Sequence, residues 1–282
     1  MPTSIILSRY QAQPILDARK SGIKKLESSL DLGVTKTCIE ILDEGIKTAA
    51  DFLIPWDILE KISQHEVGCF EVHSDGLDKI QLYSELMSRV YTLMPTPGPP
   101  TMLVSGLPMH RIKATDPHKD TLSKIAAVKP VHGAVLDTTT GLGYTAIEAA
   151  KSAESVITVE LDPAVVEICR RNPWSKALFS RPNIERRISD VYDEIERFDA
   201  SFFSRIIHDP PTFSLAGDLY SGQFYSQLYR VLKAKGRLYH YVGDPSSRSG
   251  HRTTIGVVQR LRDAGFKRVE TKANAFGVVA YK

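Results

Sequence analysis

Apolar and polar residues alternate with two different periods in the last two thirds of the chain. Short apolar runs typical of buried strands stand at 133–137, 155–160, 205–209 and 237–243. Between them lie segments whose apolar residues recur every three or four positions, as in helices. Strands that alternate with helices predict a doubly wound, mostly parallel α/β sheet. Two further strand patterns, at 267–272 and 275–282, lie close together in sequence and predict one antiparallel strand at the sheet edge.

The first third of the chain has a different pattern of apolar and polar residues. Here, short apolar runs alternate with turn residues, and the pair Asp75-Gly76 predicts a tight hairpin. The segment 94–100, MPTPGPP, holds four prolines and a glycine, which is typical of a break between elements. We therefore predict a small β-rich domain over 1–95, with one short helix around 54–62, followed by a catalytic domain over 96–282.

Helix signals follow the break. Asp116-Pro117 predicts a helix start, and Leu122, Ile125 and Ala126 would lie on one face of this helix. The pattern predicts two later helices, one over 223–236 closed by Gly236 and one over 253–265 closed by Gly265. The segment 246–252 between them, SSRSGHR, predicts a polar, basic loop at the carboxyl edge of the sheet.

Length and composition set the broad class. A chain of 282 residues with 42% hydrophobic and 24% charged residues is typical of a globular protein with about two domains. We find no run of apolar residues that predicts a membrane span and no secretory signal pattern, and so we expect a cytoplasmic protein. The three cysteines are too far apart in sequence to predict a disulfide framework or a zinc site, and we expect no metal.

Basic charge gathers at the end of the chain. Residues 201–282 contain 13 Lys and Arg against 5 Asp and Glu, whereas residues 1–100 contain 10 against 14. A basic surface in the last third attracts a polyanion, and nucleic acid is the usual candidate. A merely solvated basic surface is the alternative interpretation.

The sequence VLDTTTGLGYT, which begins at Val135, places an acidic residue and a glycine turn between a strand and a helix. Only Gly141 and Gly143 are present, so the three-glycine pattern for a dinucleotide pyrophosphate is not met. Asp137 at the strand end suits a cationic ligand such as S-adenosylmethionine. Glu160 ends the next strand, where a carboxylate can accept both ribose hydroxyls, and Asp190 follows as an acceptor for an adenine amino group.

With these residues in this order, residues 100–282 resemble the class I S-adenosylmethionine-dependent methyltransferases, which have a Rossmann-like fold. The resemblance implies S-adenosylmethionine as cofactor and a set of cofactor-binding residues: Asp137, Thr138, Gly141, Gly143, Tyr144, Glu160, Leu161, Asp190 and Val191.

The segment IIHDPPTFS, 206–214, stands at the end of the strand predicted at 205–209, which is the fourth strand in the family's order. It is similar to the DPPY and NPPY motifs of methyltransferases that act on amino nitrogens of bases. Asp209 and the carbonyl of Pro210 can accept the two N–H groups of an exocyclic amine, and Pro211 helps to stiffen the turn. An aromatic ring, here Phe213, can stack on the base. Thr212 separates the prolines from Phe213, and the variant DPPTF also resembles bacterial ribosomal RNA methyltransferases that act on ring positions.

The resemblance therefore implies a nucleic-acid base, most often an amino nitrogen in ribosomal or transfer RNA, as substrate. The whole chain resembles an archaeal group of RNA methyltransferases with a DPP(T)F motif. We assign the catalytic role to Asp209, Pro210, Pro211 and Phe213, and RNA phosphate contacts to Arg248, His251 and Arg252. Methylation of carbon 5 of cytosine is disfavoured, because it needs a cysteine nucleophile and none lies near the fourth or fifth strand.

Three alternatives stay open at this point. An aminopropyltransferase similar to polyamine synthases has the same cofactor site, but it needs clustered carboxylates for a polycation. A small-molecule or protein methyltransferase has the same cofactor motifs, and a non-catalytic RNA-binding protein can keep the fold. A further basic segment, MHRIK at 109–113, precedes the first helix, and contact of His110, Arg111 or Lys113 with the cofactor is an open question.

Overall fold

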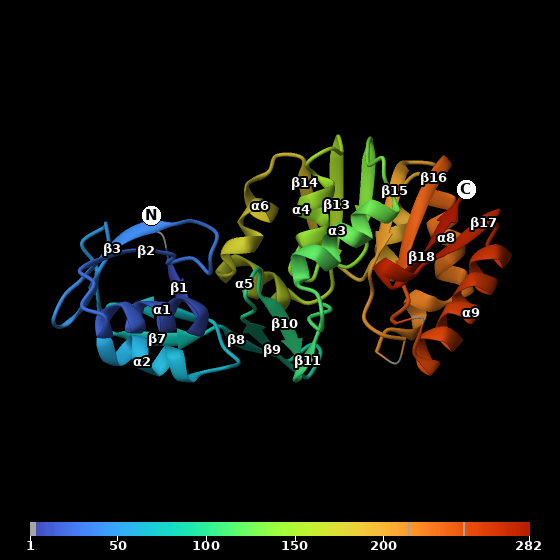
Figure 1. The fold of residues 1–282 in the computed structure, drawn as a ribbon. Helices are drawn as coiled ribbons and strands as arrows, with labels where there is room; N and C mark the ends of the chain where they lie inside the picture. The colour runs from blue at the N-terminus through green and yellow to red at the C-terminus, as the bar shows by residue number, and fades with distance from the viewer. Residues whose placement is uncertain (1–3, 214, 245) are drawn as a thin grey trace. The chain divides into compact units, whose positions relative to one another are not determined.

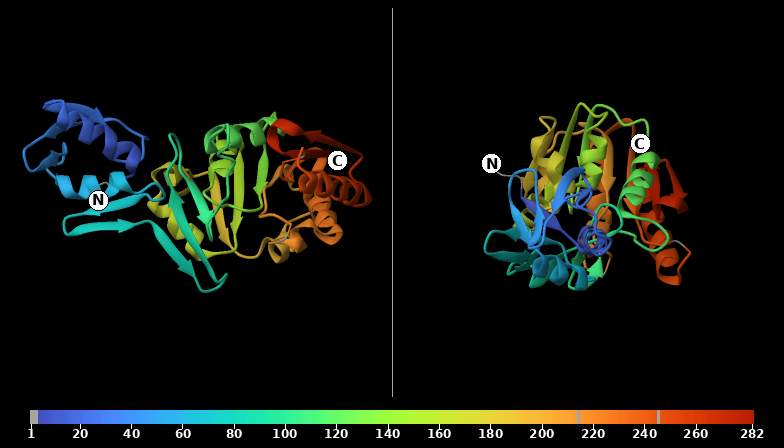
Figure 2. Two further views of the ribbon diagram at one scale, coloured as in Figure 1. Left: turned by 60° about the horizontal axis from the view of Figure 1, so that its bottom comes forward. Right: turned by 60° about the vertical axis from the view of Figure 1, so that its left-hand side comes forward.

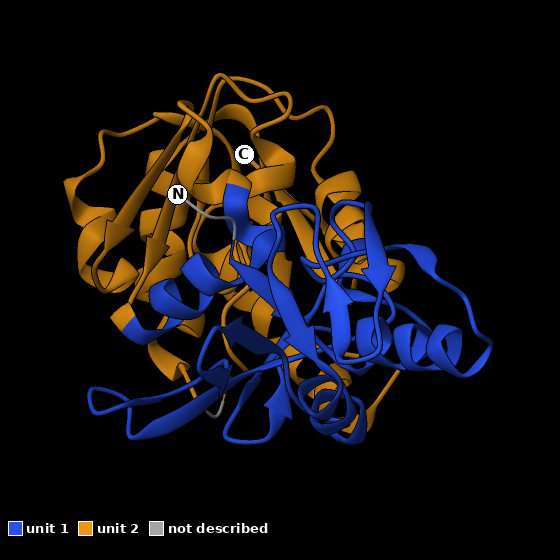
Figure 3. Cartoon of the chain, turned by 90° about the vertical axis from the view of Figure 1, so that its left-hand side faces the viewer, with its two compact units in different colours: residues 1–118, 164–176 blue, residues 119–163, 177–282 orange. Residues whose placement is uncertain are grey.

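The computed structural model describes residues 4–213, 215–244 and 246–282, so Ser214 of the DPPTF segment lies outside the described residues. The chain forms two compact units, which we describe separately (Figure 3). Unit 1 comprises 1–118 and 164–176, and unit 2 comprises 119–163 and 177–282. The predicted boundary at 95–96 falls within unit 1, which continues to residue 118.

Unit 2 is built on a seven-stranded sheet with the order β14-β13-β12-β15-β16-β18-β17 (Figure 1). All neighbours from β14 to β16 are parallel, and β18 is antiparallel to both β16 and β17. The strands are β12 (Ala134–Asp137), β13 (Ser155–Glu160), β14 (Ile184–Ile188), β15 (Phe203–His208), β16 (Leu232–Tyr241), β17 (Arg268–Lys272) and β18 (Gly277–Tyr281). The mostly parallel, doubly wound sheet is thus confirmed.

The position of the antiparallel strand was predicted wrongly. It is not at the edge, because β17 takes the edge and the hairpin returns β18 into the gap between β16 and β17. This placement gives β18 hydrogen-bonded neighbours on both sides, which suits its sequence GVVAY, whose first four residues are buried.

Helices flank this sheet: α3 (Pro117–Ala127), α4 (Tyr144–Ala149), α6 (Lys176–Ser180), α7 (Val191–Glu194), α8 (Gly222–Val231) and α9 (Arg248–Asp263). Helix α3 begins at the predicted Pro117. Two boundaries were predicted wrongly. Helix α8 ends at Val231, and 232–236 begin strand β16, whereas α9 begins at Arg248, with Ser247 as its N-cap, so 248–252 form a helix start instead of a loop.

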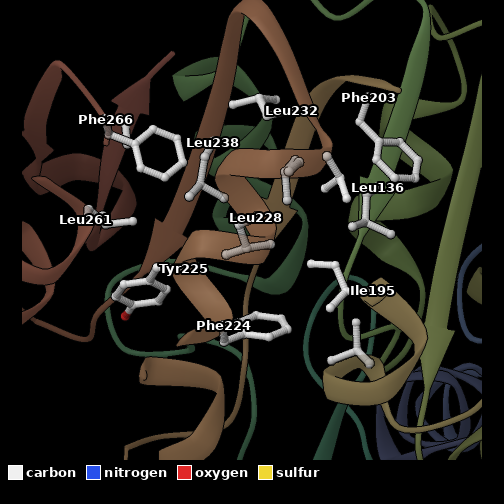
Figure 4. Packing of buried hydrophobic residues seen from close by; sticks show 14 of the residues in the cluster. Leu136, Ile195, Phe203, Phe224, Tyr225, Leu228, Leu232, Leu238, Leu261 and Phe266 are labelled. Atoms are coloured by element: carbon white, nitrogen blue, oxygen red, sulfur yellow. The ribbon is translucent and has the colours of Figure 1, made fainter. Parts of the chain in front are cut away.

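The core of unit 2 lies between α8, α9 and one face of the sheet. Phe224 and Leu228 of α8 point toward Leu136, Ile195 and Phe203 in the same cluster (Figure 4). These side chains are at most 1% exposed, and burying each one removes enough apolar surface to contribute about 1.5–3 kcal/mol. The core thus holds β12 and β15 side by side, and the ends of those two strands carry the predicted catalytic and cofactor residues.

Unit 1 contains three small antiparallel sheets (Figure 2). They are β1-β6-β7, β2-β3-β4-β5 and β11-β10-β9-β8, with bounds β1 (Ile5–Leu7), β2 (Lys25–Ser28), β3 (Thr37–Ile41), β4 (Gly45–Lys47), β5 (Leu53–Pro55), β6 (Phe70–His73), β7 (Gly76–Lys79), β8 (Gln81–Ser84), β9 (Arg89–Met94), β10 (Thr101–Val104) and β11 (Leu107–Pro108). The Asp75-Gly76 turn is confirmed, because His73 pairs with Gly76. The proline-rich segment 95–100 connects β9 to its antiparallel partner β10.

Two helices cover the first sheets of unit 1, where one was predicted. Helix α2 (Trp56–Gln64) matches the predicted helix, and α1 (Arg9–Lys20) was missed because Pro14 lies inside it. Two features stabilise this helix in spite of the proline. Ser8 and Gln11 form a capping box at its start, and Ala12, Ile15 and Leu16 are buried on one face. Helix α5 (Pro163–Arg171) groups mainly with unit 1 and buries Val165, Ile168 and Cys169.

Helix length bears on the membrane question. Among the helices of the described ranges, the longest, α9, has 16 residues, and none is long and apolar enough to span a bilayer.

Candidate active site

The predicted cofactor and catalytic residues gather at the carboxyl edge of the parallel strands. Asp137 and Glu160 end β12 and β13, Asp190 follows β14, and Asp209 follows β15. The chain runs outward from β12 through β13 to β14 and from β15 to β16 on the other side. The strand order therefore reverses between β12 and β15, and such a switch point is where open α/β sheets bind ligands.

The side chain of Asp137 is completely buried. Its carboxylate accepts hydrogen bonds from Thr145 Oγ1 at 2.8 Å and Thr158 Oγ1 at 2.6 Å. Burial raises the pKa of Asp137 to about 7, and the charges of Asp209 and Glu160 add to this rise. Asp137 thus ties β12 to β13 and α4 in this structure, and its direct contact with a cofactor stays a prediction.

Glu160 lies at the surface of the same edge and is half-buried. Its two carboxylate oxygens accept backbone N–H groups, one from Gly141 at 3.0 Å and one from Asp162 at 3.1 Å. Burial raises the pKa of Glu160 to about 7, although these backbone N–H groups act in the opposite direction. Each carboxylate oxygen has a second lone pair, so Glu160 can still accept hydroxyl groups.

The glycines of the turn adopt conformations that other residues avoid. Gly141 has φ of 51° and Gly143 has φ of 75°. Gly143 is also the N-cap of α4, and a Cβ there would lie 2.7 Å from the side chain of Leu178. The backbone N–H of Thr140 donates to Val159, and its hydroxyl bonds Thr158 at 2.7 Å. The turn is therefore fixed between the ends of β12 and β13.

The other predicted cofactor residues lie around this turn. Asp190 is exposed and caps α7 by accepting the Tyr192 N–H at 2.8 Å. Leu161 is 40% exposed, Val191 is buried, and Tyr144 is half-buried at the start of α4. The sheet thus brings all these residues to one edge, and their roles toward a cofactor stay predictions.

Two threonines connect the glycine turn that follows β12 to the DPPTF segment that follows β15. Thr139 Oγ1 donates to the backbone carbonyl of Asp209 at 2.7 Å, and the Thr138 N–H donates to Ile207 at 3.0 Å. Thr138 Oγ1 also bonds His208 Nδ1 at 2.7 Å, and His208 Nε2 bonds the carbonyl of Leu219 at 2.9 Å. Burial lowers the pKa of His208 to about 4, so this imidazole is neutral at pH 7 and structural.

The DPPTF segment leaves β15 across an aromatic cluster. Tyr220 is buried, donates its hydroxyl to the carbonyl of Pro211 at 3.0 Å, and so braces the turn. Pro210 is buried and Pro211 exposed. Phe213 lies edge-on to Tyr220, with ring centroids 5.5 Å apart, and is 55% exposed. The turn is rigid, whereas the Phe213 ring faces solvent and is available for stacking.

The structure adds a charged residue that the sequence interpretation missed. Lys124 of α3 is buried, with 2% of its side chain exposed, and its Nζ lies 2.6 Å from Asp209 Oδ2 and 2.8 Å from Asp120 Oδ2. Burial alone lowers the pKa of the Lys124 ammonium, but the charges of Asp209 and Asp120 outweigh burial and hold that pKa above its ordinary value. The group of Asp120, Lys124 and Asp209 therefore carries one net negative charge.

The predicted inward face of α3 was wrong. Asp120, Thr121, Lys124 and Ile125 are buried, whereas Leu122 is 38% exposed and Ala126 is exposed. Asp120 and Lys124 are four residues apart, a spacing that normally indicates a solvated ion pair on a helix surface. Only the contact with Asp209, 85 positions later, turns this pair inward.

The basic residues assigned to RNA and the segment considered for cofactor contact fall in two places. Arg248, His251 and Arg252 are exposed in the first turns of α9, which follows the fifth parallel strand. His110 belongs to unit 1, where its Nδ1 bonds Thr101 Oγ1 at 3.0 Å. The described residues contain no cluster of three or more His, Cys, Asp or Glu that could hold a metal ion.

With this geometry in view, we compared the chain with known proteins. It is 44% identical over 259 residues to the uncharacterized protein MJ1233 of Methanocaldococcus jannaschii, and the match covers 90% of this chain and 88% of that protein. The chain belongs to the family of this archaeal protein. No family model matches the sequence.

The fold of this family is also that of spermidine synthases. One solved spermidine synthase, in complex with the transition-state analogue AdoDATO, is 21% identical, with a TM-score of 0.59 and coverage of 72% of both chains. The spermidine synthase of Thermotoga maritima is 18% identical, with a TM-score of 0.56 and coverage of 76% of this chain and 73% of that one. The resemblance extends beyond the seven-stranded sheet, because its coverage exceeds the length of unit 2.

Proposed function

We propose that this protein is an S-adenosylmethionine-dependent methyltransferase that acts on an exocyclic amino nitrogen of a base in ribosomal or transfer RNA. One observation carries this proposal. Asp209 of the DPP motif stands beside the glycine turn at the switch point of the sheet, and its carboxylate is already ion-paired with a buried lysine. The fold and the resemblance of the motifs support the reaction class.

The donor set at the edge fits this cofactor. Asp137 and Glu160 are close enough for their charges to act on one another, whereas the charge of Asp209 is paired with that of Lys124. An excess of carboxylates suits the sulfonium and ammonium groups of S-adenosylmethionine and repels a pyrophosphate. Glu160 would accept the ribose hydroxyls and Asp190 the adenine amino group, while Leu161 and Val191 would flank the adenine. When bound, the cofactor supplies an electrophilic methyl group.

The residues of this chain would orient the nucleophile. Asp209 accepts one N–H of the amine and the carbonyl of Pro210 accepts the other, so the nitrogen lone pair turns out of conjugation with the ring and toward the methyl group. Thr139 and Tyr220 hold the backbone of this turn through the carbonyls of Asp209 and Pro211. Phe213 offers a ring on which the extruded base stacks. No covalent enzyme intermediate is needed.

The ion pair also separates this proposal from aminopropyl transfer. A polyamine substrate carries ammonium groups, which need carboxylates that have no cationic partner. Lys124 Nζ already lies 2.6 Å from Asp209, and its charge is fixed in place by burial and by Asp120. A neutral aromatic amine does not meet this repulsion, and therefore Lys124 favours a base over a polyamine.

Cofactor affinity is expected to depend on pH. The pKa values of Asp137 and Glu160 are raised to about 7, so both groups are partly protonated in the ligand-free protein at neutral pH. A cationic ligand and hydroxyl donors favour the ionised carboxylates. The affinity for S-adenosylmethionine should therefore rise as pH increases through about 7 and then level off. Calorimetry across this range measures the effect.

A substitution at Glu160 tests whether this carboxylate causes the pH dependence of cofactor affinity. Glu160→Gln should weaken binding about tenfold at pH 8 and flatten the pH dependence, because the amide accepts fewer hydroxyl groups and does not titrate. Glu154→Gln changes an exposed carboxylate that precedes the amino end of β13, at the opposite end of that strand from Glu160. It is the matched control and should behave as wild type. A pH dependence equally steep in Glu160→Gln and wild type would remove Glu160 from the cofactor site.

The role of Phe213 is tested through substrate affinity. Phe213→Ala should weaken RNA binding by about 1–3 kcal/mol if the ring stacks on the base, because base–aromatic stacking contributes that much. Phe213→Tyr keeps an aromatic face and should bind nearly as wild type. Phe202, also an exposed phenylalanine of unit 2, provides the control Phe202→Ala. Equal affinities of Phe213→Ala and the control would show that the ring does not touch the base.

The substrate is identified by nucleoside mass spectrometry of total RNA from a strain that lacks this gene. We expect one methylated base to disappear and to return when the wild-type gene is restored. Restoration with Asp209→Asn should fail. An unchanged set of nucleosides would argue against RNA as the substrate and would direct attention to small molecules or proteins.

A further inference from the structure

A groove of about 510 Å³ lies in unit 2, where Ser123, Ala126 and Ala127 of α3 form part of its lining. Its walls come from the last turns of α3, the middle of β16, the end of β17, the turn 273–275 and the end of β18. Among its described lining residues are three cations, Lys129, Arg237 and Lys272, and no carboxylate. Ser123, Asn274 and Tyr281 add hydroxyl and amide groups. This is a groove for an anion and not a typical apolar ligand pocket.

Strand register shows how the floor of the groove is made. Arg237 of β16 pairs with Tyr281 of β18, and Tyr281 pairs with Arg268 of β17, so these three side chains form a row on one sheet face. The guanidinium carbons of Arg237 and Arg268 lie 5.5 Å and 3.9 Å from the centroid of the Tyr281 ring. The row thus places an aromatic ring between two cations, and cation–π contacts hold both guanidinium groups at this ring.

On the sheet face that carries Arg237 and Tyr281, the described cations outnumber the carboxylates that pair with them. Glu270 pairs with Arg268 at 3.1 Å and with Lys272 at 2.8 Å, so one carboxylate serves two cations. Arg237 donates to the backbone carbonyl of Lys129, which leaves its charge uncompensated by that contact. Lys129 itself is exposed. The face therefore keeps a positive charge, and its cations other than Lys129 lie in the basic last third of the chain.

The groove leads toward the candidate active site. Tyr241, Gly277 and Lys272 form a second register row, four pairings further along the same strands. Lys124 Nζ lies 5.1 Å from the centroid of the Tyr241 ring, on the face that α3 covers, and binds Asp209 at 2.6 Å. Since adjacent strands are about 4.8 Å apart, the backbone of Lys272 lies about 10 Å from that of Tyr241. A short single strand spans this distance.

We propose that this groove binds the single-stranded RNA that flanks the target nucleotide, with phosphates on Lys129, Arg237 and Lys272 and a base or sugar against Tyr281. This inference rests on the proposed function, because it takes the target base to be at Asp209. It adds a second RNA contact to the predicted one at Arg248, His251 and Arg252. The RNA strand then runs from Asp209 along α3 into the groove.

The test removes two charges without touching the site of reaction. Lys129→Ala/Lys272→Ala leaves Arg237 in place, because that side chain also supports the backbone of Lys129. The matched control, Lys151→Ala/Lys233→Ala, removes two exposed charges of unit 2 that do not line the groove. The probe is a mixed-sequence oligoribonucleotide of about 12 nucleotides, a length within the usual range of single-strand sites. Its affinity is measured against salt concentration.

The groove variant should bind this RNA about tenfold more weakly at low salt than the control. Its plot of log affinity against log salt should be shallower by about 1.4, since each phosphate contact on a single strand contributes about 0.7. Cofactor affinity should not change, and in methylation of the identified RNA KM should rise while kcat is kept.

Two outcomes separate this inference from the proposed function. If the groove variant matches the control in RNA affinity and salt slope while wild type still methylates RNA, the RNA-binding role of the groove is overturned. The proposed methyltransferase function then stands. If the groove variant binds RNA more weakly than the control but the wild-type protein methylates no RNA, the RNA-binding role of the groove is supported. The proposed methylation reaction is then overturned.

Discussion

Replacing Asp209 with asparagine is expected to lower the rate of methyl transfer at least about a hundredfold, which corresponds to about 2.7 kcal/mol of activation free energy. The variant keeps the shape of the side chain but replaces one acceptor oxygen with a donor, so one N–H of the amine loses its partner. Cofactor affinity should be nearly unchanged, because Asp209 acts on the nucleophile.

Single-turnover methylation with labelled S-adenosylmethionine measures this effect on the RNA that mass spectrometry identifies. Asp218→Asn, a change at an exposed aspartate of unit 2, provides the matched control. Lys124 keeps its pairing with Asp120 in Asp209→Asn, so the fold should persist, and circular dichroism checks this. If Asp209→Asn methylates as fast as wild type, the DPP segment is structural and the reacting group lies elsewhere.

Replacing Lys124 with methionine is expected to have the second large effect, on both stability and rate. Asp120 is completely buried, and the variant removes the ammonium group that pairs with it at 2.8 Å. Removal of one partner of a buried ion pair typically costs about 3–5 kcal/mol of stability. Asp209 also loses the contact that fixes its carboxylate, so turnover should fall at least about tenfold.

A double variant separates the two effects. Lys124→Met/Asp120→Asn removes the buried charge of Asp120 and should recover much of the stability lost in Lys124→Met, as thermal unfolding measures. Its rate should stay low, because Asp209 still lacks the contact with Lys124. A rate that recovers together with stability would show that Lys124 serves only the fold.

The same variants bear on the choice between a base and a polyamine. If the site accepted a polyamine, removing the Lys124 charge would expose Asp120 and Asp209 to its ammonium groups, and spermidine would bind more tightly to Lys124→Met. We expect spermidine to bind weakly to wild type, because Lys124 already occupies these carboxylates. Tight spermidine binding to wild type would favour aminopropyl transfer instead.

The local pattern of the sequence determined strands β12, β13 and β15 of unit 2 and the order of its acidic residues, whereas β14 was not predicted. Strand β13, for example, begins and ends where SVITVE does, since an unbroken apolar run between turns has one stable placement in a parallel sheet. Because parallel strands end at one edge, Asp137, Glu160, Asp190 and Asp209 could be placed together before any coordinates were known.

Tertiary structure decided what local pattern does not encode. Strand β18 enters the sheet between β16 and β17 because pairing partners are chosen in space, and Pro14 is tolerated in α1 because a capping box and a buried face stabilise the rest of that helix. Lys124 is the clearest case. An Asp and a Lys four positions apart indicate a solvated pair, and only the third charge from Asp209, brought close by the sheet, makes burial of that lysine favourable.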